Sequence, residues 1–136
     1  MLRGKYDSYS IILLHKPEDR ARAMEIAGSF PQVLVPFDLS FDQFAAFIKR
    51  LSVLVTPDTS AVHLAAAFGV PSVILYVQSD KSLRIWEPYR TECETIVTEG
   101  ELSTIAVSSV FQAFQRLMAR LSLLHPAQHS GITERV

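Results

Sequence analysis

Short apolar runs alternate with amphipathic stretches along most of the chain. The apolar runs, which have the length and composition of buried strands, cover residues 9–14, 32–36, 52–55, 72–77 and 95–98. The stretches with apolar residues at helical spacing cover residues 17–28, 40–51, 59–68 and 103–123. Strands that are apolar on both faces and alternate with helices are typical of a parallel sheet covered by helices. The pattern therefore predicts an α/β layer fold with a mostly parallel sheet.

The stretch from Thr56 to Pro71 lies between two of these apolar runs and has clear helix signals at both ends. Asp58 or Thr59 can cap a helix here, and Gly69 occupies the place of a left-handed C-terminal cap. We expect a helix over 59–68, capped by Asp58, with its N-terminus at the carboxyl edge of the sheet. Such an N-terminus offers free N–H groups and the positive end of the helix dipole, so it suits a phosphate group.

Two other helices have recognisable starts. Pro17 is suited to a first helical turn, and the acid Glu18 follows it, which favours the helix dipole. Gly28 marks the expected end of that helix. Ser40 and Gln43 have the spacing of a capping box, in which each side chain bonds the backbone N–H of the other residue.

Composition and charge narrow the choice of function. The chain has 136 residues, of which 49% are hydrophobic, which suits one domain with a packed core. The net charge is −1, with 13 basic and 14 acidic residues and no basic block, which argues against nucleic acid as the main partner. No apolar run reaches the roughly 18–20 residues of a transmembrane segment. The single cysteine, Cys93, fits a reducing compartment, so we expect a cytoplasmic protein.

Asp58, Thr59, Ser60 and His63 form the most informative cluster of polar residues. On a helix that begins near Thr59, His63 lies one turn further on the same face. The hydroxyl and backbone N–H groups could then bind a diphosphate, with His63 donating to the same anion. The alternative is that Asp58 is an ordinary helix cap and His63 is a half-buried side chain with satisfied hydrogen bonds.

The residues from Pro57 to Pro71 read PDTSAVHLAAAFGVP. This run resembles the signature D-[ST]-G-x-x-H-L-A-A-A-x-G-x-P of heptosyltransferase-type glycosyltransferases, the glycosyltransferase family 9 group. The resemblance extends over about residues 9–120. It implies a Rossmann-like three-layer domain with a mostly parallel sheet of four or five strands, the C-terminal, donor-binding half of a GT-B enzyme. This domain would span residues 1–124, followed by a flexible tail at 125–136.

The resemblance also implies a ligand and the residues that bind it. Asp58, Thr59, Ser60 and His63 would hold the diphosphate of an ADP-sugar or another nucleotide-sugar. Glu18, or its neighbour Asp19, would match a family acid that binds the donor ribose. The nucleotide-sugar is a substrate, and neither a cofactor nor a metal is implied. His125 and His129 lack the partners of a metal site, and we expect Trp86 to cover an edge of the core.

Three departures from the family pattern stand out. Ser60 occupies the place of a family glycine that allows close approach to a phosphate. His15-Lys16-Pro17 follows the first apolar run, where the family usually has a glycine-rich strand end. The third and largest departure is the length of the chain. A complete enzyme of this family is more than twice as long, so we expect this chain to lack the acceptor domain with the proposed catalytic base, and we assign no catalytic residue. By the same comparison with the family pattern, we expect the first strand and helix of the donor domain to be missing. We therefore expect residues 11–14 and 53–55 to pair directly within one sheet.

Two functions from different classes fit these observations. The first is the donor-binding part of a glycosyltransferase that transfers a sugar to lipopolysaccharide or a related glycan. Its partners would be a nucleotide-sugar and either a separate N-terminal acceptor domain or a second copy of the chain, and a parent enzyme could attach it to the inner membrane. The second is a non-catalytic remnant that binds a nucleotide weakly or serves in protein interaction, as the short chain and Ser60 suggest. Whether this chain is an enzyme by itself stays open.

Overall fold

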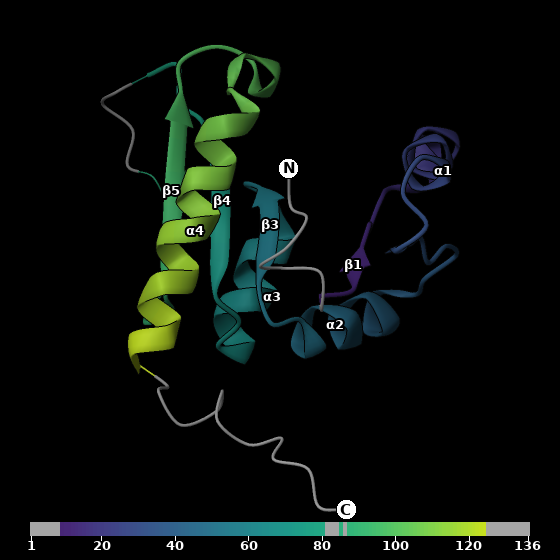
Figure 1. Ribbon diagram of the computed structural model, residues 1–136, viewed down its shortest axis with the longest axis horizontal. Coiled ribbons are helices and arrows are strands. Elements are labelled where there is room, and N and C mark those ends of the chain that lie inside the picture. The colour runs from purple at the N-terminus through teal and green to yellow at the C-terminus, as the bar shows by residue number, and fades with distance from the viewer. Residues whose placement is uncertain (1–8, 81–84, 86, 125–136) are drawn as a thin grey trace, which may run out of the picture. The chain divides into compact units, whose positions relative to one another are not determined.

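The computed structural model describes residues 9–80, 85 and 87–124 and divides the chain into two compact units. The boundary falls between Phe44 and Ala45, inside one helix. The first unit contains β1 (Ile11–Ile12), η1 (Pro17–Asp19), α1 (Arg20–Gly28), β2 (Val33–Leu34) and the start of α2 (Phe41–Arg50). The second contains the rest of α2, β3 (Leu54–Pro57), α3 (Ser60–Phe68), β4 (Ser72–Val77), β5 (Cys93–Thr98), η2 (Leu102–Thr104) and α4 (Val107–Leu124) (Figure 1).

The first unit is a small parallel βαβ arrangement. Ile11 pairs with Val33 and Ile12 with Leu34, and α1 forms the crossover between the two strands. The predicted capping box at the start of α2 is confirmed. The Ser40 N–H donates to Gln43 Oε1 at 2.9 Å, and the Gln43 N–H donates to Ser40 Oγ at 3.2 Å.

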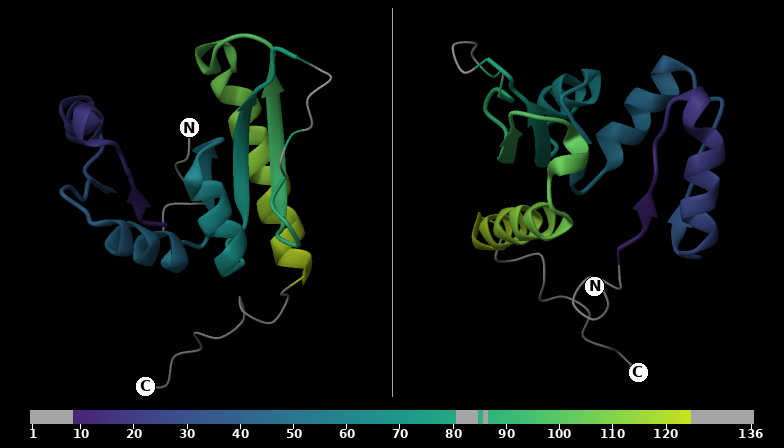
Figure 2. Two further views of the ribbon diagram at one scale, coloured as in Figure 1. Left: turned by 180° about the vertical axis from the view of Figure 1, so that it is seen from behind. Right: turned by 90° about the horizontal axis from the view of Figure 1, so that it is seen from above.

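The second unit is a three-stranded parallel sheet with the order β3-β4-β5. Successive residues of the central strand β4 point to opposite faces of the sheet and so contact different helices. Ile74 packs with Val62 of α3, and Val73 packs with Ala113 and Leu117 of α4. The two helices thus cover opposite faces of the sheet, as Figure 2 shows. All five residues are fully buried, which makes β4 the centre of the core.

An ion-pair network ties α4 to the edge strand β5. Arg116 Nε donates to Glu94 Oε2 at 2.8 Å, and Arg120 Nη1 donates to Glu94 Oε1. Arg120 Nη2 also donates to the backbone carbonyl of Cys93 at 2.8 Å. Burial by itself would raise the pKa of Glu94, but the hydrogen bonds from Arg120 and Arg116 outweigh it and hold that pKa below its ordinary value.

The Glu94 network should make part of the stability depend on pH. A lowered folded-state pKa means that the stabilisation is fully present above the unfolded-state pKa, about 4.3 for glutamate, and is lost as pH falls through the folded-state value. We expect Glu94→Gln to lower the free energy of unfolding at pH 7 and to match the wild type increasingly as pH falls below about 4. Urea unfolding from pH 7 to pH 3 measures this difference. If the difference in free energy of unfolding between the wild type and Glu94→Gln stayed constant over this range, the role of the Glu94 charge would be contradicted.

The α/β class with parallel strands is confirmed and is consistent with a Rossmann-like domain. The predicted single sheet of four or five strands is not found, because the strands of the described residues form two sheets, of two and three strands. The predicted direct pairing of residues 11–14 with 53–55 is also wrong. β1 pairs with β2, the next strand across the α1 crossover, and β3 pairs with β4 across α3. Each sheet therefore forms between strands that are consecutive in the chain, which is the commonest arrangement.

Several expectations concern residues outside those that the structure describes. The tail at 125–136 and Trp86 are among them, and the domain limits stay a prediction. None of the helices in the described part of the chain combines the length and the apolar character that a membrane crossing requires.

Candidate functional site

The connection from β3 to α3 places the signature residues at the carboxyl edge of the three-stranded sheet. β3 ends at Pro57, α3 begins at Ser60, and Asp58 and Thr59 form the turn between them. The Asp58 N–H donates to the Leu75 carbonyl of β4 at 3.1 Å, which ties the turn to the central strand. The predicted helix over 59–68 is confirmed to within one residue, and so is the position of its N-terminus.

Thr59, and not Asp58, caps α3. Thr59 has the extended backbone of an N-cap, with φ −141° and ψ 177°, and its Oγ1 accepts a hydrogen bond from the Ala61 N–H at 3.3 Å. The expectation that Asp58 is the cap is therefore wrong. The reason is that the chain enters the helical conformation at Ser60, which leaves Asp58 one residue too early. At the other end, Gly69 adopts the predicted left-handed conformation, with φ 69°.

The identity of the cap can be tested by two matched substitutions. Thr59→Ala removes the acceptor of the Ala61 N–H and should lower the free energy of unfolding by about 1 kcal/mol, the usual cost of a lost N-cap. Asp58→Ala removes an exposed side chain and should stay within about 0.5 kcal/mol of the wild type. Chemical denaturation of both variants shows which substitution lowers the free energy of unfolding more. A larger loss for Asp58→Ala would show that the cap is misassigned.

The structure brings four of the five predicted ligand-binding residues together. The side chains of Asp58, Thr59, Ser60 and His63 are all exposed, and they occupy the turn and the first helical turn of α3. The exposed position of His63 disagrees with the alternative in which it is a half-buried, satisfied side chain. Glu18, the fifth residue, is exposed in η1 of the first unit, so it is not part of the cluster at the start of α3.

The polar groups at the start of α3 differ in what they can offer to an anion. The backbone N–H groups in the first turn of a helix have no carbonyl acceptor within that helix. In the described part of the chain, the Ser60 N–H has no hydrogen-bond acceptor outside the helix either. The Asp58 N–H, in contrast, is already bonded to β4. Burial raises the pKa of Tyr76 to about 12, with a further contribution from the negative charge of Asp58. That charge would oppose an anion, so binding would depend on Thr59, Ser60 and His63.

Ser60 brings no backbone strain to the site. It is the first residue of α3, and the non-glycine residues with positive φ among the described residues are Asp38 and Arg90. The backbone therefore does not require a glycine at this position. The hydroxyl of Ser60 is an additional hydrogen-bond donor beside the free amide.

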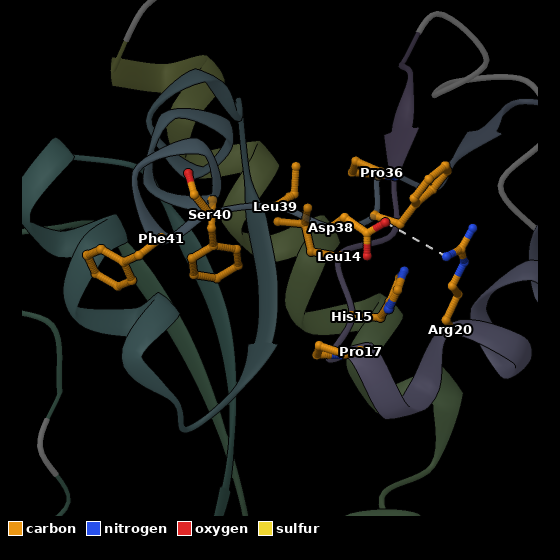
Figure 3. A pocket seen from close by; sticks show the side chains of 11 residues that line it. Leu14, His15, Pro17, Arg20, Pro36, Asp38, Leu39, Ser40 and Phe41 are labelled. Carbon is orange, nitrogen blue, oxygen red and sulfur yellow. Dashed lines mark ion pairs between the residues drawn. The ribbon is translucent and has the colours of Figure 1, made fainter.

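A pocket of about 360 Å³ that was not predicted from the sequence lies in the first unit (Figure 3). His15 Nδ1 is 2.7 Å from the Lys16 carbonyl, and its Nε2 is buried without a hydrogen-bond partner among the described residues. Arg20 lies over the ring of Phe37 at 4.1 Å. The residues that line the pocket are Leu14, His15, Pro17, Arg20, Pro36, Phe37, Asp38, Leu39, Ser40, Phe41 and Phe44.

A signal for this pocket was present in the sequence. Asp38 closely follows the predicted strand at 32–36, and an acid after the second strand of a Rossmann-type unit commonly binds a ligand hydroxyl. No group of three or more histidine, cysteine or acidic side chains that could hold a metal ion occurs within the described ranges 9–80, 85 and 87–124.

A comparison with protein families identifies the family to which the chain belongs. Residues 4–112 of the chain match Glycosyltransferase family 9 (heptosyltransferase), which is more than half of the 136 residues. The chain belongs to glycosyltransferase family 9. The match includes the whole Thr56–Pro71 stretch and confirms the resemblance seen in the sequence. No significant match was found among curated proteins or among solved structures.

Proposed function

We propose that this glycosyltransferase family 9 chain binds a nucleotide-sugar donor, with the donor diphosphate at the N-terminus of α3. The observation that carries the proposal is the exposed helix N-terminus at the carboxyl edge of a parallel sheet, with Thr59, Ser60 and His63 around it. In parallel α/β sheets, ligands bind outside this edge. Phosphate groups bind at helix N-termini because the N–H groups and the dipole both favour negative charge.

Each group has a separate role in this proposal. The free Ser60 N–H and the dipole of α3 attract the diphosphate, and the hydroxyls of Thr59 and Ser60 donate hydrogen bonds to its oxygens. His63, one turn further along the same side, donates from its imidazole. Asp58 holds the turn through its bond to Leu75 and does not touch the anion. A diphosphate held in this way is also stabilised as a leaving group, because its charge grows when the bond to the sugar breaks.

The reaction class follows from the family and stays part of the proposal. It is the transfer of a heptose or a related sugar from a nucleotide-diphosphate donor to lipopolysaccharide or a similar glycan, without a metal. The setting would be the cytoplasm, at the inner membrane through a parent enzyme. In this proposal the chain contributes the donor-binding part of the reaction, and no catalytic base is assigned.

Titration calorimetry with ADP and with ADP-sugars tests the proposal on the full chain. We expect binding in the micromolar range for ADP and weaker binding for AMP, which lacks the second phosphate. Binding should also weaken as salt increases, because partly exposed charges are screened. No heat of binding at millimolar ADP would refute the donor site and would favour the non-catalytic remnant.

A further inference from the structure

Two exposed aromatic rings, each with a cation beside it, lie at the amino edge of the three-stranded sheet. Lys49 Nζ is 5.8 Å from the centre of the Phe68 ring, and the guanidinium carbon of Arg90 is 5.5 Å from the centre of the Tyr89 ring. Lys49 lies in the last turn of α2, before β3. Phe68 ends α3, which runs antiparallel to the strands (Figure 1), and Tyr89 and Arg90 precede β5. We call these four residues the amino-edge patch.

Hydrogen bonds hold the segments of the amino-edge patch side by side. Thr91 Oγ1 donates to the Ala66 carbonyl of α3 at 3.3 Å, which ties the loop before β5 to the end of that helix. The Ser72 N–H donates to the Glu92 carbonyl at 3.0 Å, which ties the same loop to β4. The contact between the lysine and the phenylalanine ring joins α2 to the same helix end. The patch is therefore one continuous surface of the second unit.

Core packing does not account for the amino-edge patch. Tyr89 is 78% exposed and Phe68 is 40% exposed, so much of each ring lies outside the core. Arg90 has a φ of 56°, a left-handed backbone that is uncommon for non-glycine residues and often occurs at functional sites. Lys49 also favours the dipole of α2 from its last turn, but Arg90 precedes a strand and has no such role. The exposed rings and the Arg90 turn therefore favour a binding partner.

The charge of this region indicates the kind of partner. Arg50, which is exposed, follows Lys49 at the end of α2, so two cations stand there and Arg90 adds a third. Glu87, on the loop that carries Arg90, offsets one of these charges. The carboxylate of Glu92 is paired with an arginine of α4 at 3.3 Å. The amino edge is thus positive although the whole chain has a net charge of −1, and it is complementary to an anionic surface.

We propose that the amino-edge patch binds an anionic lipid bilayer directly, with its two rings at the level of the headgroups and its two cations on the lipid phosphates. Tyrosine, lysine and arginine combine an apolar body with a polar tip, which suits a surface that is apolar on one side and wet on the other. Basic residues close to a membrane are attracted to anionic lipids. Protein interfaces, in contrast, are depleted in lysine.

The amino-edge patch does not overlap the proposed diphosphate site. Phe68 and Ser60 are the two ends of α3, a helix of nine residues, so about 13 Å separate the patch from the helix N-terminus. A bilayer bound at the amino edge therefore leaves the carboxyl edge of the sheet open to a ligand from solution. The inference goes beyond the proposed function, because it needs no nucleotide.

Co-sedimentation of the full chain with lipid vesicles tests the proposal. One set of vesicles contains equal parts of phosphatidylglycerol and phosphatidylcholine, and the neutral reference is phosphatidylcholine alone. We expect binding to the anionic vesicles that weakens as salt increases, and about tenfold weaker binding to the neutral vesicles. Arg90→Gln and Lys49→Gln should each weaken binding to the anionic vesicles about fivefold. Tyr89→Ala should weaken it about tenfold, because the ring no longer enters the headgroup region.

Arg22→Gln is the matched control for the lost charge. Arg22 is exposed on α1 and does not belong to the amino-edge patch, and its substitution changes the net charge by the same amount as Arg90→Gln. It should change the affinity for anionic vesicles less than about twofold. Arg90→Gly is a second variant that removes the charge and accepts the positive φ without strain, so a folding defect of Arg90→Gln cannot hide the answer.

Three results would overturn the proposal. One is equal sedimentation with anionic and neutral vesicles, including none with either. Another is an equal loss of affinity in Arg22→Gln and Arg90→Gln, which would mean that overall charge alone attracts the chain. The third is binding of polyglutamate, a soluble acidic polymer, with the same dependence on Arg90 and Tyr89, which would assign the patch to an acidic protein segment. Because the vesicles carry no nucleotide, these results and the ADP results at α3 can fail separately.

Discussion

Leu117→Ala should lower the free energy of unfolding by about 2–5 kcal/mol, the range for a large aliphatic side chain removed from a packed core. Leu117 is fully buried on the sheet-facing side of α4, where it packs with Ala113 of the same helix and Val73 of β4. Alanine would leave a cavity that two rigid elements, a helix and a central strand, cannot close by small shifts. Urea denaturation followed by circular dichroism measures the loss.

Gln115→Ala is the matched control for this substitution. Gln115 is exposed on the same helix, two residues from Leu117, so the change alters α4 without altering the core. It should stay within about 0.5 kcal/mol of the wild type, because alanine is a good helix former and no packed contact is lost. Similar losses for both variants would mean that α4 does not pack on β4 through Leu117.

His63→Ala should weaken ADP binding about tenfold or more and leave the fold intact. His63 is exposed on α3, so its removal opens no cavity, and alanine has the higher helix propensity. The expected loss of affinity is that of one strong hydrogen bond to a charged phosphate. Calorimetry with ADP measures the affinity, and a thermal melt of the same protein sample measures the stability.

Lys49→Ala is the control for the position of His63 at the start of α3. Lys49 is an exposed cation whose Nζ lies 5.8 Å from the ring of Phe68, the last residue of α3, so it is at the opposite end of the helix. If binding depends on the helix N-terminus, Lys49→Ala should leave ADP affinity nearly unchanged. A large stability loss in His63→Ala with unchanged ADP affinity would show that His63 is a structural residue.

Local signals in the sequence predicted the surroundings of α3 well. The run from Ser72 to Val77 forms β4 over the predicted residues, and Gly69 forms the predicted left-handed cap. Apolar periodicity and end signals determine such elements, because they act within a few residues. The same is true of the capping box of Ser40 and Gln43, which needs only the correct spacing.

Features that depend on exact backbone angles or on distant residues were not predicted. Asp58 and Thr59 are both good caps, and only the residue at which the helical angles begin selects Thr59. Strand pairing joins segments far apart in the chain, so the short strand β1 could not be assigned its neighbour from its own sequence. The pocket around Asp38 likewise combines loops from two strands. Asp38 closely follows a predicted strand, but no pattern in its own segment indicates its left-handed backbone.

The hydrogen bond from the Asp58 N–H to the Leu75 carbonyl has a consequence for ligand binding. It joins the turn before α3 to β4, which is paired on both edges and covered on both faces. Segments of this kind open only with much of the domain, whereas most binding loops open at low cost. The proposed anion site at α3 would therefore be preorganised, and a ligand bound there would lose little affinity to the ordering of a loop. The affinity of the ligand would then depend on its contacts with the polar groups of the site.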